Sequence, residues 1–237
     1  MTAPLIFLPG WCLGSTPLNA TVNRKKGQIF ELPGSSSAPL ISDFYAAADD
    51  IATRLQPGTT LAGWSLGAQL ALAVAARHPD KVGKMILIAG TASFVQRDGW
   101  PHAMAPAMLA EFAAGIAADV EAMLPRFVGG FNRGDARAKA VTLELLQLAD
   151  PRPSGEVLAT GLNWLRDVDL RELAPQVKAP TLLIHGAADP LMPLGAAEAL
   201  AALIPGARLA VFDDCAHAPF MSRPDDFAAT VQQFLND

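Results

Sequence analysis

The sequence predicts a doubly wound α/β fold built on a mainly parallel sheet, and three observations support this prediction. Short apolar runs that suit buried strands recur along the 237 residues. Helical stretches follow most of these runs, which requires right-handed crossovers and therefore parallel strands. Between residues 91 and 179 the alternation gives way to helical patterns without a convincing strand. We expect one core, formed by residues 1–90 and 180–237, with a helical lid inserted at residues 91–179.

The core elements follow from the apolar runs and from the glycine and proline residues between them. In chain order, strands are expected at Leu5–Leu8, Gln28–Leu32, Thr59–Gly63, Met85–Ala89, Thr181–His185 and Arg208–Phe212. Helices are expected at Asp43–Leu55 and Leu66–Arg77, which are rich in alanine, and at Leu194–Leu203 and Asp225–Leu235, which follow the last two strands.

The lid is expected to contain several helices separated by proline and by glycine-rich turns. Their predicted positions are Ala105–Gly115, Asp119–Phe127, Asp135–Leu148 and Gly155–Leu165. Open α/β sheets bind ligands at the carboxyl ends of their strands. A helical insertion at this point of the chain would cover that end of the sheet and any site formed there.

Composition restricts the class of protein. An apolar content of 51% and a charged content of 17% are typical of a folded globular protein, and a net charge of −5 provides no basic surface for nucleic acid or an anionic membrane. No apolar run approaches the roughly 20 residues that cross a bilayer, and Leu5–Leu8 is interpreted as a strand rather than a signal peptide. We expect a soluble, cytoplasmic protein.

The cysteine content agrees with this interpretation. Cys12 and Cys215 are too few for a disulfide framework, and no C-x-x-C spacing indicates zinc or redox chemistry. Both residues fall in loops that are expected to converge on one end of the sheet. Two free thiols are favoured over a regulatory disulfide, and a reducing cytoplasm is the simplest compartment.

The segment from Thr60 to Leu72 has the layout of a nucleophile elbow. An apolar strand leads into a turn with glycine on both sides of Ser65, and an alanine-rich helix follows. Gly63 and Gly67 remove the β-carbons that would collide where strand and helix pack so closely. Such a turn holds its serine in a strained conformation with the hydroxyl raised above the sheet. Ser65 is therefore the predicted nucleophile.

A serine nucleophile needs a histidine base, and the chain has four histidines. His78 ends the helix that follows the elbow and is interpreted as a helix C-terminal residue. His102 lies at the start of the lid, and His185 ends a strand, where a core or turn histidine is favoured. His217 remains, in the loop between the last strand and the terminal helix, and is the predicted general base.

The acid that orients the base should lie at a strand end and between Ser65 and His217 in chain order. Asp189 fits best, because it stands in the turn after the strand Thr181–His185 and is followed by proline. An aspartate that merely makes a turn is the alternative for this residue. The weaker competitors are Asp213 and Asp214 at the end of the last strand and Asp167 and Asp169 at the end of the lid.

Acyl transfer also needs donors for the oxyanion. The backbone amide of Leu66, which follows the nucleophile, and the amide of Trp11, in the loop after the first strand, are the expected pair. The side chains of Trp11 and Trp64 would either line an apolar acyl pocket or serve as core aromatics. No metal or organic cofactor is required for this chemistry.

With these residues identified, the chain resembles the α/β-hydrolase superfamily, and within it the pimeloyl-[acyl-carrier protein] methyl ester esterases of biotin synthesis. The resemblance extends along most of the chain. It is carried by Pro9-Gly10-Trp11-Cys12-Leu13-Gly14, Gly63-Trp64-Ser65-Leu66-Gly67, Arg97-Asp98-Gly99-Trp100-Pro101, Asp167-Val168-Asp169-Leu170-Arg171 and Ala216-His217-Ala218-Pro219-Phe220. The tryptophan inside the elbow and the His-Ala-Pro-Phe motif are more selective than the general hydrolase pattern.

The resemblance implies cleavage of a methyl ester on a pimeloyl chain that an acyl-carrier protein holds, with methanol and the free acid as products. It also implies that lid arginines bind the acidic carrier, and Arg126, Arg133 and Arg137 stand at the matching positions, with Phe127 beside the first. Arginine suits this task because its planar guanidinium pairs with phosphate and carboxylate groups. The alternative for these arginines is an ordinary solvated helix face.

The chain also departs from the family pattern. Pro9 stands where the family usually has histidine, Ala122 replaces a further arginine, and the lid is shorter between Phe127 and Arg133. The usual first hairpin of the fold is expected to be missing. The same triad could serve a broad short-chain esterase that acts on small esters, a thioesterase or a carbon-carbon bond hydrolase. A noncatalytic hydrolase-fold binding module is the alternative from another class.

Overall fold

Six parallel strands form the sheet in this computed structural model, which describes residues 3–35, 38–149 and 153–237. The strands are β1 (Leu5–Leu8), β2 (Gln28–Ile29), β3 (Thr59–Trp64), β4 (Val82–Ile88), β5 (Thr181–Gly186) and β6 (Arg208–Phe212). They lie in the order β2-β1-β3-β4-β5-β6, and every neighbouring pair is parallel. The predicted doubly wound α/β fold is confirmed.

β3 and β5 each extend one residue beyond their predicted ends, and two further strands differ more from their predicted bounds. The expected extension of β2 to Leu32 is wrong, because β2 lies at the edge of the sheet and its neighbour β1 has four residues to pair with. β4 begins at Val82, ahead of the apolar run. A β-carbon at Gly83 would lie 2.5 Å from the carbonyl oxygen of Gly58, so glycine permits a backbone contact that the hydrophobic pattern does not mark.

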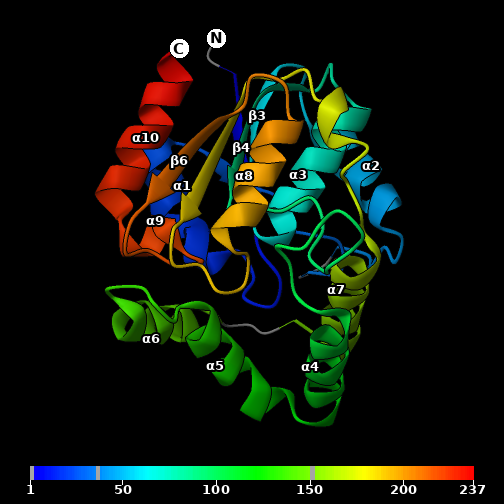
Figure 1. The fold of residues 1–237 in the computed structure, drawn as a ribbon. Coiled ribbons are helices and arrows are strands. Elements are labelled where there is room, and N and C mark those ends of the chain that lie inside the picture. The colour runs from blue at the N-terminus through cyan, green and yellow to red at the C-terminus, as the bar shows by residue number, and fades with distance from the viewer. Residues whose placement is uncertain (1–2, 36–37, 150–152) are drawn as a thin grey trace.

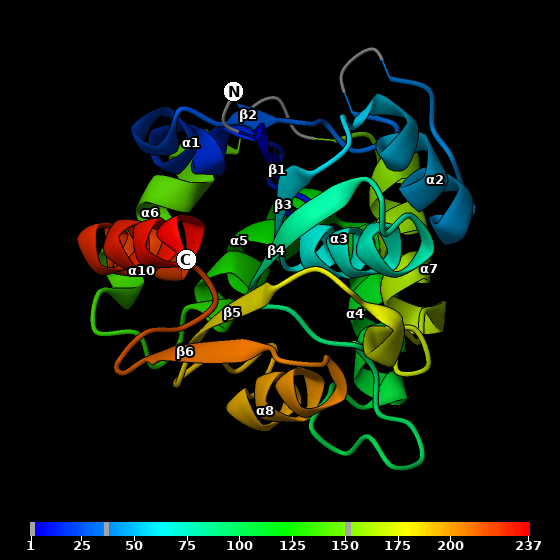
Figure 2. The same cartoon turned by 90° about the horizontal axis from the view of Figure 1, so that it is seen from above.

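Helices cover both faces of the sheet, as Figures 1 and 2 show. One face carries α1 (Asn19–Lys25) and α10 (Pro224–Asn236), and the other carries α2 (Phe44–Arg54), α3 (Leu66–Arg77) and α8 (Leu194–Leu203). Helix α3 is buried from Leu66 to Ala75, because it lies between the sheet and α2. Its many alanines allow this close approach on both sides.

Several short helices are not marked by the sequence pattern. These are α1, α9 (Pro219–Ser222) and the 3-10 helices η1 (Thr16–Leu18) and η2 (Ala174–Gln176). Helix α1 has seven residues and buries two of them, Thr21 and Val22, so it presents almost no apolar stripe. Among the described residues, no helix is long and apolar enough to cross a membrane.

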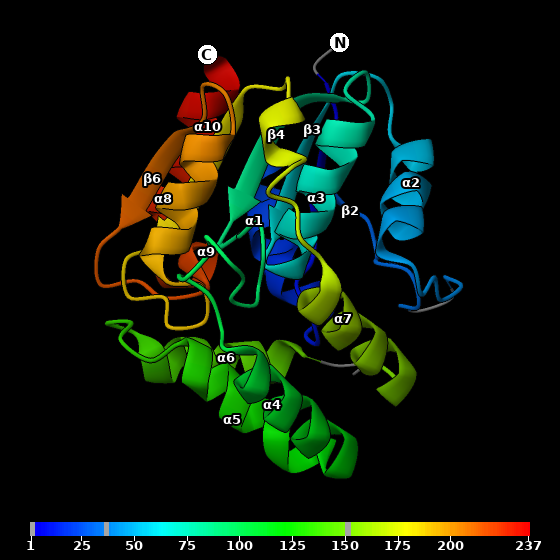
Figure 3. The same ribbon diagram turned by 45° about the vertical axis from the view of Figure 1, so that its right-hand side comes forward.

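In the described part of the chain, four α-helices and η2 lie between β4 and β5, in agreement with the predicted helical segment. The α-helices are α4 (Pro106–Ala118), α5 (Val120–Phe131), α6 (Ala138–Leu148) and α7 (Gly155–Asp167). Figure 3 shows that α4, α5 and α6 form a separate layer below the carboxyl ends of the strands. The predicted start at Asp119 is an N-cap, since its side chain accepts the Ala122 amide. We call α4–α7 the inserted helices.

The two ends of the insertion are joined where the chain leaves and re-enters the core. The Arg97 guanidinium donates to the Arg166 carbonyl at 2.9 Å and to the Ser93 hydroxyl at 2.9 Å. The Arg171 guanidinium binds the Asp169 carboxylate with two nitrogens and also donates to the Asp98 carbonyl. These contacts fix the two ends of the insertion to each other.

Candidate active site

Ser65 stands in the turn between β3 and α3, with φ 58° and ψ −117°. A non-glycine residue in this region is strained, and only close packing around it keeps the backbone there. A β-carbon at Gly63 would lie 2.1 Å from the carbonyl oxygen of Gly67, and one at Gly67 would lie 2.4 Å from the carbonyl oxygen of Leu8. Both glycines are therefore required by contacts between backbone segments.

The elbow lies at the point where the strand order reverses. β2 lies on one side of β1 and β3 lies on the other, so the loops after β1 and β3 separate at the carboxyl end of the sheet. In open α/β sheets such a switch point leaves a crevice for a ligand. Trp11 follows β1 and Ser65 follows β3, which brings both to this crevice.

Three side chains form a buried hydrogen-bond relay. The Ser65 hydroxyl oxygen lies 3.0 Å from His217 Nε2, and His217 Nδ1 lies 2.7 Å from an Asp189 carboxylate oxygen. A carboxylate only accepts hydrogen bonds, so Nδ1 carries the proton and Nε2 is free to accept from the serine. This arrangement is that of a nucleophile, a general base and an orienting acid.

Both oxygens of the Asp189 carboxylate accept hydrogen bonds. Its second oxygen accepts the backbone amides of Leu191 and Met192 at 2.9 and 3.0 Å. The competing acids lie elsewhere among the described residues. Asp213 and Asp214 are exposed, Asp167 pairs with Arg166, and Asp169 pairs with Arg171. The relay uses Asp189, as the position at a strand end predicts.

The other three histidines have separate surroundings. His78 is bound to the Asp49 carboxylate at 2.7 Å at the end of α3, as expected for a helix-terminal residue. His102 is exposed and packs against Gly195. His185 is buried, and its Nε2 lies 2.6 Å from the Met192 carbonyl, so this nitrogen carries the proton.

Burial lowers the pKa of His185 below its ordinary value of 6.5, although the nearby Asp189 carboxylate opposes the shift. His185 is therefore neutral, and its 3.8 Å approach to Asp189 is not an ion pair.

Stability should depend on pH through His185. As the pH drops, this histidine is protonated in the unfolded chain before it is protonated in the folded protein, so the free energy of unfolding should fall below about pH 6.5. His185→Gln should flatten this part of the stability profile in urea titrations at several pH values. His102→Gln should leave the profile unchanged, and an equal slope in all three proteins would contradict the assignment.

Two backbone amides are the predicted oxyanion donors, one at the start of α3 and one in the loop after β1. Leu66 is the first residue of α3, so its N–H has no partner within the helix. In the part of the chain that the structure describes, no turn, loop or cap hydrogen bond is donated by the Trp11 amide. Both amides remain the predicted oxyanion donors.

The two tryptophans have different roles in the packing. The Trp11 indole donates to the Leu158 carbonyl of α7 at 3.0 Å, and its ring meets Phe112 and Phe127 edge to face. It therefore connects the loop after β1 to three of the inserted helices. The Trp64 indole donates to the His217 carbonyl at 2.9 Å, and this hydrogen bond holds the loop that carries His217.

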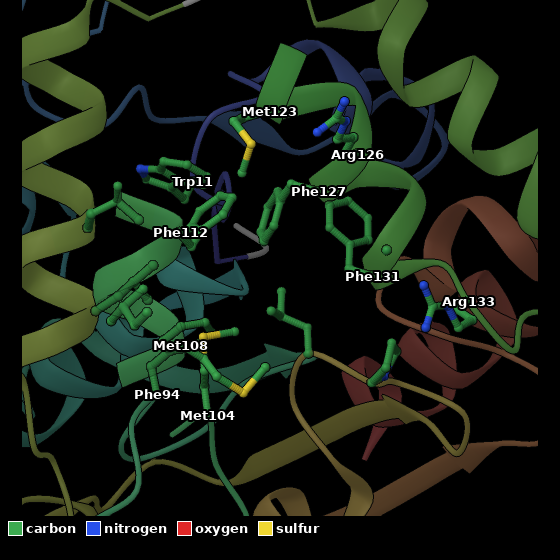
Figure 4. A pocket seen from close by; sticks show the side chains of 16 residues that line it. Trp11, Phe94, Met104, Met108, Phe112, Met123, Arg126, Phe127, Phe131 and Arg133 are labelled. Carbon is green, nitrogen blue, oxygen red and sulfur yellow. The ribbon is translucent and has the colours of Figure 1, made fainter. Parts of the chain in front are cut away.

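A large apolar cavity of about 380 Å³ lies between the inserted helices and the sheet. Figure 4 shows aromatic and methionine side chains around it, and its labelled lining consists of Trp11, Phe94, Met104, Met108, Phe112, Met123, Arg126, Phe127, Phe131 and Arg133. A smaller cavity shares Trp11 and Phe127 with it and is also lined by Ser65, Trp64 and His217. The relay therefore lies beside a small space that borders the apolar cavity.

Most of the cavity lining is not identified by sequence reasoning alone. Met123, Phe127 and Phe131 recur at intervals of four residues on α5, which is the signal that could have revealed this face. The Phe131 ring lies 5.0 Å from the His217 imidazole, so the same helix also contacts the base. Of these three residues, the sequence analysis identified Phe127.

The three predicted carrier-binding arginines divide into two groups. All three are exposed, and Arg126 and Arg133 line the large cavity. Arg137 does not line that cavity, and its guanidinium donates to the carbonyls of Met221 and Ser222 at 3.1 Å each. Arg137 thus holds α9 in place, and its predicted part in binding a partner stays a prediction.

Both cysteines are buried free thiols. Burial raises the pKa of the Cys12 thiol far above its ordinary range. Burial, reinforced by the Asp135 carboxylate, raises the pKa of Cys215 to about 12. Both groups therefore stay protonated at neutral pH and are poor nucleophiles, and Ser65 remains the predicted nucleophile.

Known proteins are similar to this chain in sequence and in fold. The model of the alpha/beta hydrolase family matches residues 5–230. A pimeloyl-[acyl-carrier protein] methyl ester esterase of Aromatoleum aromaticum is 38% identical over 245 residues, covering 98% of this chain and 97% of the relative. The protein of the same name from Nitrosomonas europaea is 34% identical over 235 residues, covering 95% and 92%. An esterase structure from Exiguobacterium antarcticum is 26% identical with a TM-score of 0.89, covering 99% of this chain and 92% of the other.

The family match spans both halves of the core and the inserted helices between them. The similar proteins are named as esterases. The chain belongs to the alpha/beta hydrolase family and is a carboxylic ester hydrolase.

Proposed function

We propose that this protein hydrolyses the methyl ester of pimeloyl-[acyl-carrier protein] to the free acid and methanol, with Ser65, His217 and Asp189 as its catalytic triad. The observation that carries the proposal is the relay of 3.0 and 2.7 Å beside an apolar cavity. The names of relatives that are 38% and 34% identical support the same substrate.

The reaction proceeds in two acyl-transfer steps. The Ser65 hydroxyl attacks the ester carbonyl while His217 Nε2 takes its proton, and the tetrahedral oxyanion is bound by the amides of Trp11 and Leu66. His217 then gives this proton to the departing methoxide, which leaves as methanol. A water molecule loses a proton to His217 and attacks the acyl-enzyme, and His217 then gives this proton to the Ser65 oxygen as the bond between serine and acyl group breaks and the free acid leaves. Asp189 holds the imidazole in the required tautomer in both steps.

The cavity has the chemistry that an acyl chain needs. Methylene groups leave water favourably when they enter a space lined by Phe112, Met123 and Phe127, at about 0.8 kcal/mol for each group. Arg126 and Arg133, in the same lining, supply positive charge for an acidic carrier or its phosphate-linked arm. In this arrangement the inserted helices are the lid, and the scissile ester lies at the inner end of the chain.

A broad short-chain esterase is the second candidate, and it is favoured by one observation. Two of the cationic positions that the resemblance implies offer a carrier less charge or fewer free donors in this chain. Arg137 is bound to the carbonyls of Met221 and Ser222, and position 122 is alanine. Fewer free cations weaken the electrostatic attraction for an acidic carrier, so small esters would then be the substrates.

Complementation of a biotin auxotroph that lacks its methyl ester esterase tests the proposed substrate. The intact gene should restore growth without biotin, and Ser65→Ala should not. The double variant Arg126→Glu, Arg133→Glu should fail to restore growth, yet should hydrolyse p-nitrophenyl butyrate at close to the parent rate because the cations do not touch the relay. Lys139→Glu changes an exposed charge of α6 and is the matched control. Failure of the intact, expressed protein, with ester hydrolysis retained, would favour the short-chain esterase.

A further inference from the structure

The loop between α5 and α6 binds directly to the segment that carries His217. The Ala136 amide donates to the Asp214 carbonyl at 2.9 Å, and the Asp135 carboxylate accepts the Ala216 amide at 2.9 Å. A β-carbon at Gly134 would lie 3.0 Å from the Ala188 β-carbon, so the same loop also packs against the turn of the triad acid. This stretch of the lid is therefore part of the wall that surrounds the base.

Asp135 is the centre of these contacts. Its side chain is buried, and one oxygen accepts the Ser222 hydroxyl at 2.8 Å and the Arg137 amide at 2.7 Å, while the other accepts Ala216. Three donors thus converge on two oxygens. The helix expected to begin at Asp135 instead begins at Ala138, because this carboxylate is turned toward the core.

An ionised carboxylate is the group that this site requires. Asparagine has the same shape, but one of its two terminal atoms is a donor. Placed toward Ala216 or toward Arg137, that donor would face a backbone N–H and leave it without an acceptor. A buried amide left without a partner is costly, so the segment would shift to restore its hydrogen bond.

We propose that Asp135 is a positioning residue for the triad, acting on His217 through the adjacent amide of Ala216. The backbone that carries the imidazole is held at two points, since the Trp64 indole donates to the His217 carbonyl and Asp135 accepts from the amide of the preceding residue. Each contact limits a different rotation of the loop. Together they keep Nε2 at 3.0 Å from the Ser65 hydroxyl. The inference rests on the proposed function of the triad and adds that the lid completes it.

The test compares Asp135→Asn with the parent enzyme. The variant should lower kcat on p-nitrophenyl butyrate by about tenfold while KM changes by less than about twofold, because the acyl cavity is untouched and a charge-assisted hydrogen bond is lost. Its labelling by a fluorophosphonate should slow by a similar factor. The downfield proton resonance of the imidazole Nδ1–H that donates to Asp189 should shift or broaden in the variant.

Asp119→Asn is the matched control, because this exposed lid aspartate caps the other end of α5 and lies outside the cavity lining. It should leave kcat, labelling and the resonance unchanged. If Asp135→Asn does not fold, Ser222→Ala removes one donor from the same carboxylate and should slow labelling about threefold. Equal labelling rates and an unmoved resonance in the folded variant overturn the proposal.

Labelling also separates this inference from the proposed substrate. A fluorophosphonate reacts with an activated serine whatever its natural ester is, and the imidazole resonance is read without turnover. Failed complementation with normal labelling of the parent would therefore overturn the carrier-linked substrate and leave the role of Asp135 standing. Normal complementation with unchanged Asp135→Asn kinetics would support the carrier-linked substrate and overturn the role of Asp135.

Discussion

Replacing Ser65 with alanine is expected to lower kcat on short p-nitrophenyl esters by about 10⁵-fold, because the acyl-enzyme can no longer form. The remaining rate over water would come from the oxyanion amides and from binding. Stopped assays at high enzyme concentration measure this remaining activity. The fold should persist, since alanine keeps the β-carbon and removes one hydroxyl whose partner is His217.

The matched variants separate loss of chemistry from loss of structure. Ser65→Gly should be equally inactive but more stable by about 1 kcal/mol, because glycine relieves the strain at φ 58°. Ser154→Ala removes an exposed serine at the start of α7 and should keep full turnover. Undiminished turnover in Ser65→Ala would show that another residue is the nucleophile.

The candidate triad could be predicted from the sequence because each of its members carries a local signal. Ser65 lies in a glycine-bracketed turn between an apolar strand and a helix, a pattern within a dozen residues. His217 could be reached by elimination, since the chain has four histidines. Asp189 could be predicted because the acid of a triad in this fold lies in a turn at the end of a strand, between the serine and the histidine in chain order. Helices α3 and α8 and strand β6 have their predicted bounds for the same local reason.

The residues around the triad could not be predicted in the same way. Asp135 lies 81 positions before Ala216 in the chain, and nothing near it marks a buried carboxylate. The contact of Arg137 with α9 depends on a short helix that the pattern does not show. Trp64 was expected as a pocket wall or core aromatic, and its donation to the His217 carbonyl depends on residues 153 positions apart. Long-range contacts of this kind are set by the packing of the whole domain.

The contrast has a physical cause. Local signals come from backbone geometry, which glycine, proline and helix caps control over a few residues. Support for a site comes from groups that satisfy buried polar atoms, and any residue type with the right donor or acceptor can do so. The insertion supplies much of this support through Leu158, which accepts from Trp11, through Phe131 of α5, and through Asp135 in the loop after α5. Variation in the lid should therefore change the efficiency of the triad as well as its substrate.

Replacing Asp189 with asparagine is expected to lower kcat by about 10⁴-fold with little change in KM, because the variant favours the wrong tautomer of the base. The amides of Leu191 and Met192 both donate to one carboxylate oxygen, so the asparagine carbonyl oxygen must occupy that position. Its NH₂ group then faces His217 Nδ1 and donates to it. The imidazole proton moves to Nε2, which can no longer accept from Ser65.

The matched controls are the acids that compete with Asp189 in the sequence. Asp213→Asn and Asp214→Asn alter exposed carboxylates near the same loop and should keep kcat within about twofold, since exposed charges contribute little. Nitrogen NMR of the imidazole distinguishes the two tautomers directly and should show the proton on Nε2 in Asp189→Asn. A variant with the proton still on Nδ1, or with normal turnover, would mean that another group orients the base. Because the two backbone amides dictate the orientation of the asparagine, the loss should appear without any change in the packing of the cavity.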